Sequence, residues 1–340
     1  MNDGSAAGLL LDADVLRRLW RGIRLDPADF SGGGGGADPE LIAPVTEPFT
    51  SVADVADRLG RLERRLVDRG DRRSVFLTVY TEMTARTAAA IDDGEFDDGE
   101  WMRRYLVRFA EYYRVAFLAF ERGAVGDVPD PWTVAFGTAV RGDALVVQDA
   151  FLGINAHIGY DLALTLSDVG IDPDRDRKYA DHRRVDAILA RLVAIQRDLL
   201  AERYAPGLSR VGETMHGLDE RWSATALRAA RETAWRVAVV RSDARWPAMG
   251  TVTEWLLSRT ATGGASIVSS PAASPSTMRA LHEVEADRFD LASYTRAFHE
   301  RATPTVADGT IGEAGSDADG SAGEASSDAD GSAGEERPTG

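Results

Sequence analysis

Hydrophobic residues between about residues 48 and 300 recur three and four positions apart in one segment after another, a spacing typical of amphipathic helices. One such segment follows Ser51, a residue type that caps helix N-termini, and its apolar positions are Val52, Val55, Leu59, Leu62 and Leu66. No stretch of strand length alternates convincingly between apolar and polar residues. The pattern therefore predicts an all-α fold, a single multi-helix bundle.

Prolines, glycines and small polar residues separate the expected helices, as they do at turns. We expect helices at about residues 52–66, 74–91, 98–120, 131–136, 143–166, 179–204, 209–220, 223–242, 251–260 and 277–299. Asp130 and Pro131 have the residue types of an N-cap and of the first helical position. The small residues at 261–275 predict a loop before the last helix.

The most apolar segment, residues 144–166, is nearly long enough to cross a membrane. Five polar residues inside it would each be costly in lipid: Gln148, Asp149, Asn155, His157 and Asp161. A helix that is apolar on nearly every side belongs in the middle of a bundle. We therefore predict a buried central helix and no membrane span.

The polar residues of this central helix form two sets, because successive residues turn by about 100°. His157 and Asp161 are four positions apart and share one face, whereas Gln148 and Asn155 lie on nearly the opposite face. Small residues let another helix or a ligand approach the backbone closely, and the strip between the two sets consists of Gly153, Ala156, Gly159 and Ala163.

Two interpretations of the polar residues remain open. In the first, His157 and Asp161 are a catalytic pair, or two ligands of one metal ion, because positions i and i+4 project together. Asn155 and Gln148 then bind a polar group of the substrate. In the second, His157 bonds to Asp161, the two amides bond to neighbouring backbone, and the motif serves helix packing.

An aromatic stripe on the helix expected at 98–120 bears on the same choice. Its members are Tyr105, Phe109, Tyr112, Tyr113 and Phe120. As pocket walls, with Tyr113 against the substrate, they indicate a small hydrophobic or lipid-like ligand. As core residues they need no ligand.

The run Leu152–Leu162, which reads Leu-Gly-Ile-Asn-Ala-His-Ile-Gly-Tyr-Asp-Leu, resembles the hallmark of an uncharacterised family, the domain of unknown function number 5995. Members typically show methionine where this chain has Ile154 and asparagine where it has Gly159. Other segments compatible with the family, in order, are Tyr80 with Met83, Phe96-Asp97, Phe109-Ala110 with Tyr113, Pro131-Trp132, and Arg231-Glu232 with Ala234-Trp235. The resemblance covers roughly residues 48–260 and implies an all-helical domain whose motif has unknown chemistry.

Further titratable residues have ordinary interpretations. Glu82 is expected to pair with Arg86 four positions later. Glu213 and His216 have the Glu-x-x-His spacing of helical di-iron proteins, but such a site needs a second copy of that motif and two more glutamates. The other near match, His282 with Glu285, has the reverse order. We therefore expect Glu213 and His216 on a solvated helix face.

Two expectations concern the later helices. His182 stands near the start of a helix, where a histidine gains nothing from the helix dipole, so we expect it to be exposed. Arg228 and Glu232 are expected to form a plain i,i+4 ion pair.

Composition limits the classes of function. The net charge of −16 argues against a nucleic-acid partner, and the lack of cysteine excludes thiolate sites. Of the 39 basic residues all but Lys178 are arginine, which with the acidic charge indicates a salt-adapted proteome or a GC-rich genome. The N-terminus has no secretory signal pattern, so we expect a cytoplasmic, soluble protein.

The chain divides into three parts by composition. Residues 1–47 hold a short amphipathic stretch at 12–23 and a glycine run, Gly32 to Gly36, which is typical of a flexible linker. Residues 48–300 form the helical bundle. Residues 301–340 contain two near-copies of an eleven-residue acidic unit with almost no apolar residue, which predicts a disordered acidic tail.

Function therefore divides into two hypotheses. The protein is an enzyme that uses the buried His157–Asp161 pair on a small hydrophobic substrate, or it is a non-catalytic helical binding or scaffold protein. The sequence specifies no cofactor and no oligomeric state.

Overall fold

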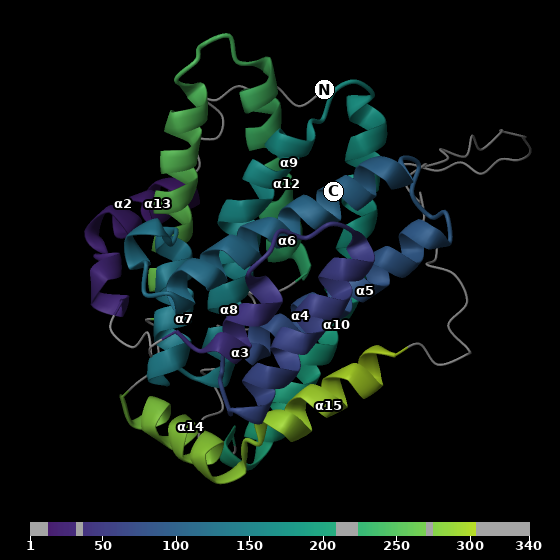
Figure 1. The fold of residues 1–340 in the computed structure, drawn as a ribbon. Coiled ribbons are helices and arrows are strands. Elements are labelled where there is room, and N and C mark those ends of the chain that lie inside the picture. The colour runs from purple at the N-terminus through teal and green to yellow at the C-terminus, as the bar shows by residue number, and fades with distance from the viewer. Residues whose placement is uncertain (1–12, 32–36, 209–223, 270–274, 304–340) are drawn as a thin grey trace, which may run out of the picture. The chain divides into compact units, whose positions relative to one another are not determined.

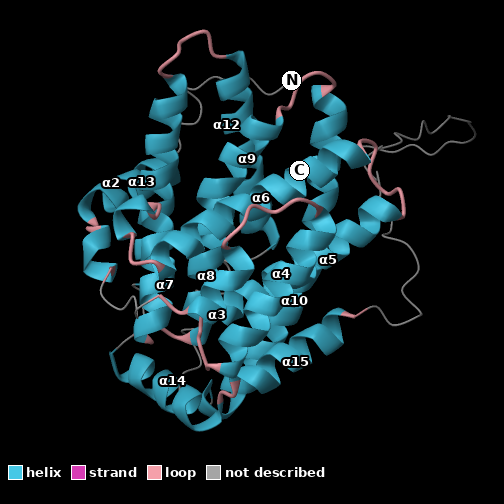
Figure 2. Ribbon diagram, in the orientation of Figure 1, coloured by secondary structure: helices cyan, strands magenta, loops and turns pink. Residues whose placement is uncertain are grey.

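The computed structural model describes residues 13–31, 37–208, 224–269 and 275–303, and within these residues the secondary structure is entirely helical (Figures 1 and 2). The chain separates into two units, residues 1–304 and 305–340, and all described residues belong to the first. The predicted all-α fold is confirmed. The glycine run, the acidic tail and the helix expected at 209–220 lie outside the described residues.

The helices follow one another with short connections. Their bounds are α2 Ala13–Arg24, η1 Pro27–Phe30, α3 Pro39–Ile42, η2 Ala43–Val45, α4 Val52–Asp68, α5 Ser74–Asp92, α6 Gly99–Glu121, η3 Val125–Asp127, α7 Asp130–Arg141, α8 Val146–Ala156, η4 His157–Asp161, α9 Leu162–Val169, α10 Arg175–Leu208, α12 Ala224–Asp243, α13 Met249–Ser269, α14 Pro275–Arg288 and α15 Leu291–Ala302.

The predicted central helix corresponds to α8, η4 and α9, which run on from one another and contact α5, α6, α7, α12 and α13 (Figure 1). It begins at Val146, later than the expected 143, because the Gln148 side chain accepts the backbone N–H of Leu145 at 2.9 Å and caps the first turn there. In η4 the helix widens to a π-turn: the N–H of Leu162 bonds to the carbonyl of His157, five residues back.

Local signals placed several helix ends correctly. Ser51 caps α4 by accepting the N–H of Asp54, and Asp98 caps α6 by accepting the N–H of Trp101. The helix expected from Asp130 and Pro131 is α7, which begins at Asp130, one residue before the Pro131 predicted as its first helical position.

The loop predicted at 261–275 is wrong over its first part, because α13 continues as a helix to Ser269. Ala261, Thr262, Gly263, Gly264 and Ala265 are all buried there. At Gly264 an added Cβ would lie 2.4 Å from Oδ1 of Asn155 on α8. Tertiary packing thus outweighs the helix cost of about 1 kcal/mol for each glycine.

The N-terminal helix α2 packs against α13. An added Cβ at Gly22 would lie 1.8 Å from the carbonyl oxygen of Arg259, and one at Gly263 would lie 1.8 Å from that of Arg18. The two backbones therefore meet where neither helix carries a side chain. Over the described residues, no helix combines the length and hydrophobicity that crossing a bilayer requires.

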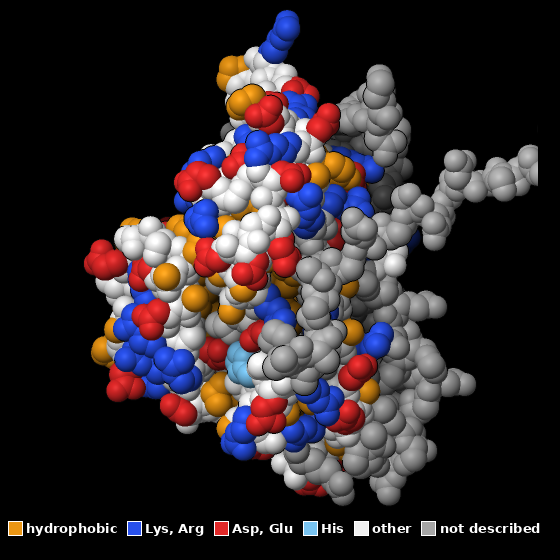
Figure 3. Space-filling view, turned by 90° about the vertical axis from the view of Figure 1, so that its right-hand side faces the viewer, with side chains coloured by type: hydrophobic (Ala, Val, Ile, Leu, Met, Phe, Trp, Pro, Cys, Tyr) orange, Lys and Arg blue, Asp and Glu red, His pale blue; other side chains and the backbone are white. Residues whose placement is uncertain are grey.

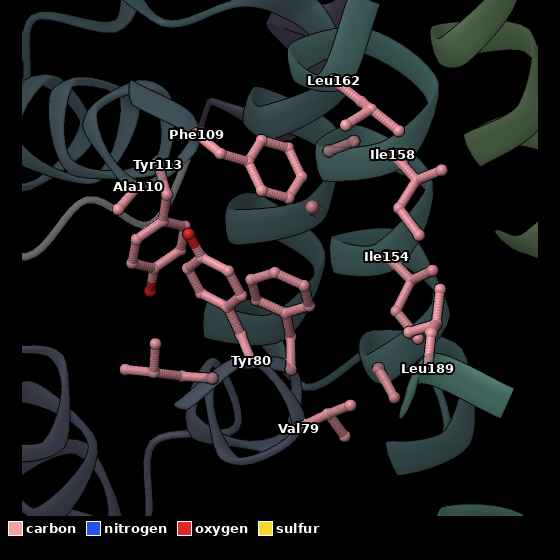
Figure 4. Packing of buried hydrophobic residues seen from close by; sticks show 14 of the residues in the cluster. Val79, Tyr80, Phe109, Ala110, Tyr113, Ile154, Ile158, Leu162 and Leu189 are labelled. Carbon is pink, nitrogen blue, oxygen red and sulfur yellow. The ribbon is translucent and has the colours of Figure 1, made fainter. Parts of the chain in front are cut away.

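Aromatic side chains concentrate where α5 and α6 meet the central helix. Figure 4 shows Tyr80 from α5 and Phe109 and Tyr113 from α6 gathered beside this helix, with Ile154 and Ile158 on the helix itself. All five side chains are buried.

Candidate functional site

The two motif residues form a buried hydrogen-bonded centre. Nδ1 of His157 lies 2.8 Å from Oδ2 of Asp161, and the same oxygen accepts the indole N–H of Trp132 on α7 at 2.9 Å. The residues of His157 and Asp161 are 2% and 0% exposed. His157 and Asp161, predicted to share a face because they are four positions apart, therefore form a hydrogen-bonded pair. Trp132, from another helix, donates a further hydrogen bond to the carboxyl group.

Aromatic rings enclose the imidazole of His157 on several sides. Phe109 stacks on it, with ring centroids 3.6 Å apart and planes 8° apart, and Tyr80 meets it edge to face at 4.5 Å. Phe76 and Trp132 follow at 5.8 Å. Two members of the aromatic stripe predicted on α6, Phe109 and Tyr113, thus pack around the histidine.

Burial controls the protonation of the pair. Loss of solvent raises the pKa of the Asp161 carboxyl well above its usual range, an effect that the hydrogen bond from Trp132 opposes. Loss of solvent also lowers the pKa of the His157 imidazole well below its usual range. Both shifts disfavour charge, so the pair is most stable as an uncharged unit.

Each partner keeps one polar atom unused. Nε2 of His157 and Oδ1 of Asp161 are buried and have no hydrogen-bond partner among the described residues. Buried polar atoms in proteins are usually paired, and an unpaired one is costly. This feature departs from a fully satisfied packing motif.

Neither His157 nor Asp161 lines any of three hollows found among the described residues. The nearest in structure is a cavity of about 20 Å³ between α5, α6 and α10, bordered by Tyr80 and Phe109, which both touch the imidazole. A volume of this size suffices for one water molecule. A groove of about 990 Å³ opens elsewhere, between α4, α5, α6 and α9.

The two amides predicted as substrate ligands face the opposite way, toward α13. The Gln148 amide donates to the carbonyl oxygen of Val268 and the Asn155 amide to that of Ala261, each at 2.7 Å. The second interpretation anticipated such backbone partners. A substrate role for Gln148 and Asn155 stays a prediction.

Tyr113, the third predicted substrate ligand, lies inside the aromatic core. Its residue is fully buried, its ring centroid is 6.4 Å from that of His157, and its hydroxyl has no hydrogen-bond partner among the described residues. The hydroxyl of Tyr80 is also buried without a hydrogen-bond partner among the described residues.

A metal site would need more ligands than the pair supplies. Within the described residues, no group of three or more histidine and acidic side chains is placed to hold a metal ion. Glu213 and His216 lie outside the described residues. Glu82 pairs with Arg86 at 2.9 Å as predicted.

A family model, described as a family of unknown function (DUF5995), matches residues 52–271. The chain belongs to this family. No curated protein matches the chain, and no solved structure does. The part matched to DUF5995 includes the central helix with its His157–Asp161 pair and leaves α2, α14 and α15 outside.

The DUF5995 region contains a second buried polar centre that sequence reasoning missed. His182, predicted to be exposed, is completely buried on α10. Its Nδ1 lies 3.2 Å from the Tyr105 hydroxyl, and Nε2 lies 3.3 Å from the carbonyl oxygen of Arg231 on α12. Burial, reinforced by the Arg231 charge, lowers the pKa of His182 well below its usual range.

Arg231 completes this second centre. It is 2% exposed, and its Nε donates to Oδ1 of Asp186 at 2.6 Å. The expected Arg228–Glu232 pair is not formed: Glu232 instead bonds to Arg236 and to the Tyr179 hydroxyl. The sequence did contain a signal for Arg231, because this residue belongs to a segment that resembles the family. Its partners are 45 or more residues away along the chain, so spacing did not reveal them.

A third polar cluster fixes the start of the central helix. Arg72 Nε donates to Asp149 Oδ2 at 2.6 Å, and Oε1 of Glu285 accepts the N–H of Val146 at 2.7 Å. Burial raises the pKa of Asp149 to about 7 although Arg72 opposes the shift. No local signal joins these residues, which come from three separate segments of the chain.

Proposed function

We propose that this chain is a non-catalytic helical binding or scaffold protein, in which His157 and Asp161 hold the bundle together. One observation carries the proposal: both side chains are enclosed, His157 by rings from three helices and Asp161 by the Trp132 indole. A catalytic group must be within reach of substrate, and these two line none of the three hollows.

A double-mutant cycle tests the packing role. We expect His157→Ala and Asp161→Ala each to lower the free energy of unfolding by roughly 1–3 kcal/mol, because each removes the hydrogen bond between the two side chains and leaves a buried polar group with fewer partners. The double variant should lose much less than the sum of the two, since the partner no longer remains. The measurement is urea unfolding followed by circular dichroism.

Asp161→Asn is the matched control for this cycle. Asparagine has nearly the same shape and keeps an oxygen that can accept the Trp132 N–H, so it should restore most of the stability lost in Asp161→Ala. Full stability of both alanine variants would overturn the packing role.

A second function, an enzyme or ligand-binding site for a small hydrophobic molecule, has one observation in its favour. The unpaired Nε2 of His157 and Oδ1 of Asp161 lie in a π-turn, an element found frequently at functional sites. His157 would then act as base or metal ligand and Asp161 would orient it, with Asn155, Gln148 and Tyr113 at the substrate.

Elemental analysis of the same proteins, purified in high salt without chelator, tests whether His157 and Asp161 bind a metal ion in this second function. A stoichiometric metal that both alanine variants lose would establish it. A cytoplasmic location and a salt-adapted origin are further proposals, supported by the sequence alone.

A further inference from the structure

The N-terminal helix α2 presents an apolar stripe on its outer face. Leu16, Trp20 and Ile23 occupy positions i, i+4 and i+7 and are 48%, 55% and 57% exposed. Their spacing places them on one side of the helix over successive turns. Removing large apolar side chains from water is favourable. A stripe of three exposed ones is therefore unusual unless a partner covers it.

The other face of α2 is fixed, so the stripe cannot turn inward. Gly22 is buried at the crossing with α13, where an added Cβ would collide with the Arg259 carbonyl. Figure 1 shows α2 lying along α13 at the edge of the bundle. Burying the stripe would therefore require α2 to leave α13.

The other exposed hydrophobic residues belong mostly to one segment, α13 and the turn before it. Among the described residues, every large exposed hydrophobic side chain except Val115 belongs to α2, to α13 or to the turn before α13. The members on and before α13 are Trp246, Val252 and Trp255.

The charge of α2 is opposite to that of the chain. The helix contains Asp14 as its single acid and four arginines, Arg17, Arg18, Arg21 and Arg24, within a protein of net charge −16. The Arg24 guanidinium lies 3.6 Å from the centre of the Trp20 ring. A short helix with tryptophan and aliphatic residues on one side and arginines beside them is typical of helices that lie in a membrane interface.

We propose that the outer face of α2 binds the surface of an anionic lipid bilayer. The apolar stripe enters the boundary between headgroups and acyl chains, and Arg21 and Arg24 in the last turn of the helix pair with lipid phosphates. A second copy of this chain fits less well, because it would bring the positive charges of two α2 helices together. This surface deepens the proposed binding role and lies outside the region matched to the family.

Sedimentation with vesicles tests the surface on the full chain. The probes are vesicles of phosphatidylcholine alone and of phosphatidylcholine with an equal amount of phosphatidylglycerol, at 0.1 M KCl. We expect binding to the mixed vesicles and at least tenfold weaker binding to phosphatidylcholine alone. Trp20→Ser with Ile23→Ser should weaken binding to the mixed vesicles at least tenfold.

Two variants serve as comparisons. Val115→Ser removes an equally exposed apolar residue on α6 and should leave binding unchanged. Arg21→Gln with Arg24→Gln should weaken binding severalfold at 0.1 M KCl and much less at 2 M KCl, where salt screens charge. Circular dichroism of each variant checks that the fold is kept.

Three outcomes would overturn the lipid surface: no sedimentation with mixed vesicles, equal loss in Val115→Ser, or a wild-type dimer that Trp20→Ser converts to monomer. The last would assign the face to a second copy. None of these outcomes affects the His157–Asp161 cycle, and His157→Ala should bind vesicles like the wild type. The two proposals can therefore fail separately.

Discussion

Gly153 and Gly159 belong to the same predicted strip of small residues, yet their surroundings differ. At Gly153 an added Cβ would lie 2.4 Å from Cγ of Phe76, a ring that also contacts His157. At Gly159 the nearest atoms would be at 3.6 Å, an ordinary contact distance. Only the first glycine is required by close packing.

This difference gives a matched pair of substitutions. Gly153→Ala should lower the free energy of unfolding by about 1–3 kcal/mol, because overpacking outweighs the better helix propensity of alanine. Gly159→Ala should be neutral or should stabilise by up to about 1 kcal/mol. Urea unfolding of both variants checks this, and an equal effect at the two positions would contradict it.

At the scale of elements, His299 joins three helices. From α15 its Nε2 lies 2.8 Å from Oε1 of Glu63 on α4, and its Nδ1 lies 3.2 Å from Oε2 of Glu82 on α5. Glu82 also pairs with Arg86. The hydrogen bond to Glu63, then that to Glu82, raise the pKa of His299 to about 9. The charged imidazolium therefore links α15 to α4 and α5 at neutral pH.

This pKa shift predicts a pH dependence with a definite sign. A raised pKa contributes stability that is fully present below the ordinary histidine value near 6.5 and is lost as pH rises through about 9. The difference in unfolding free energy between wild type and His299→Gln should be largest at pH 6 and should vanish by pH 10. The effect should be modest, because the side chain is 35% exposed.

Arg301→Gln provides the control on the same helix. Arg301 pairs with Glu202 at 2.7 Å, and neither group changes charge between pH 6 and 10. The difference in unfolding free energy between the wild type and Arg301→Gln should therefore stay constant from pH 6 to pH 10. A flat curve for His299→Gln as well would show that His299 is not charged in the folded protein.

At the scale of the molecule, the dominant electrostatic feature is the net charge of −16. Figure 3 shows basic and acidic side chains intermixed over one face of the described structure. Local pairs therefore coexist with an overall excess of acid, which opposes compaction when the charges are poorly screened.

Salt should consequently stabilise the full chain. The screening length falls from about 10 Å at 0.1 M to about 3 Å at 1 M salt, so the repulsion weakens while buried pairs are little affected. The thermal midpoint should rise between 0.1 and 2 M KCl, as measured by circular dichroism. A midpoint that falls would mean that attraction between surface ion pairs exceeds the repulsion.

The sequence by itself determined the features that depend on residues close together in the chain. Helical spacing of hydrophobic residues determined the all-α fold, and the residue type at a helix start determined the cap at Ser51. Four-residue spacing placed His157 and Asp161 on one face, and the motif around them indicated the family that the match confirms.

Tertiary structure alone decided which distant groups meet. It brought Trp132 to Asp161, the α6 rings to His157, and Arg231 to a histidine that local rules had placed in solvent. It also kept α13 helical through its glycines, because backbones that pack closely require the absence of side chains. Such contacts depend on helix packing across many turns, and local sequence patterns carry no record of them.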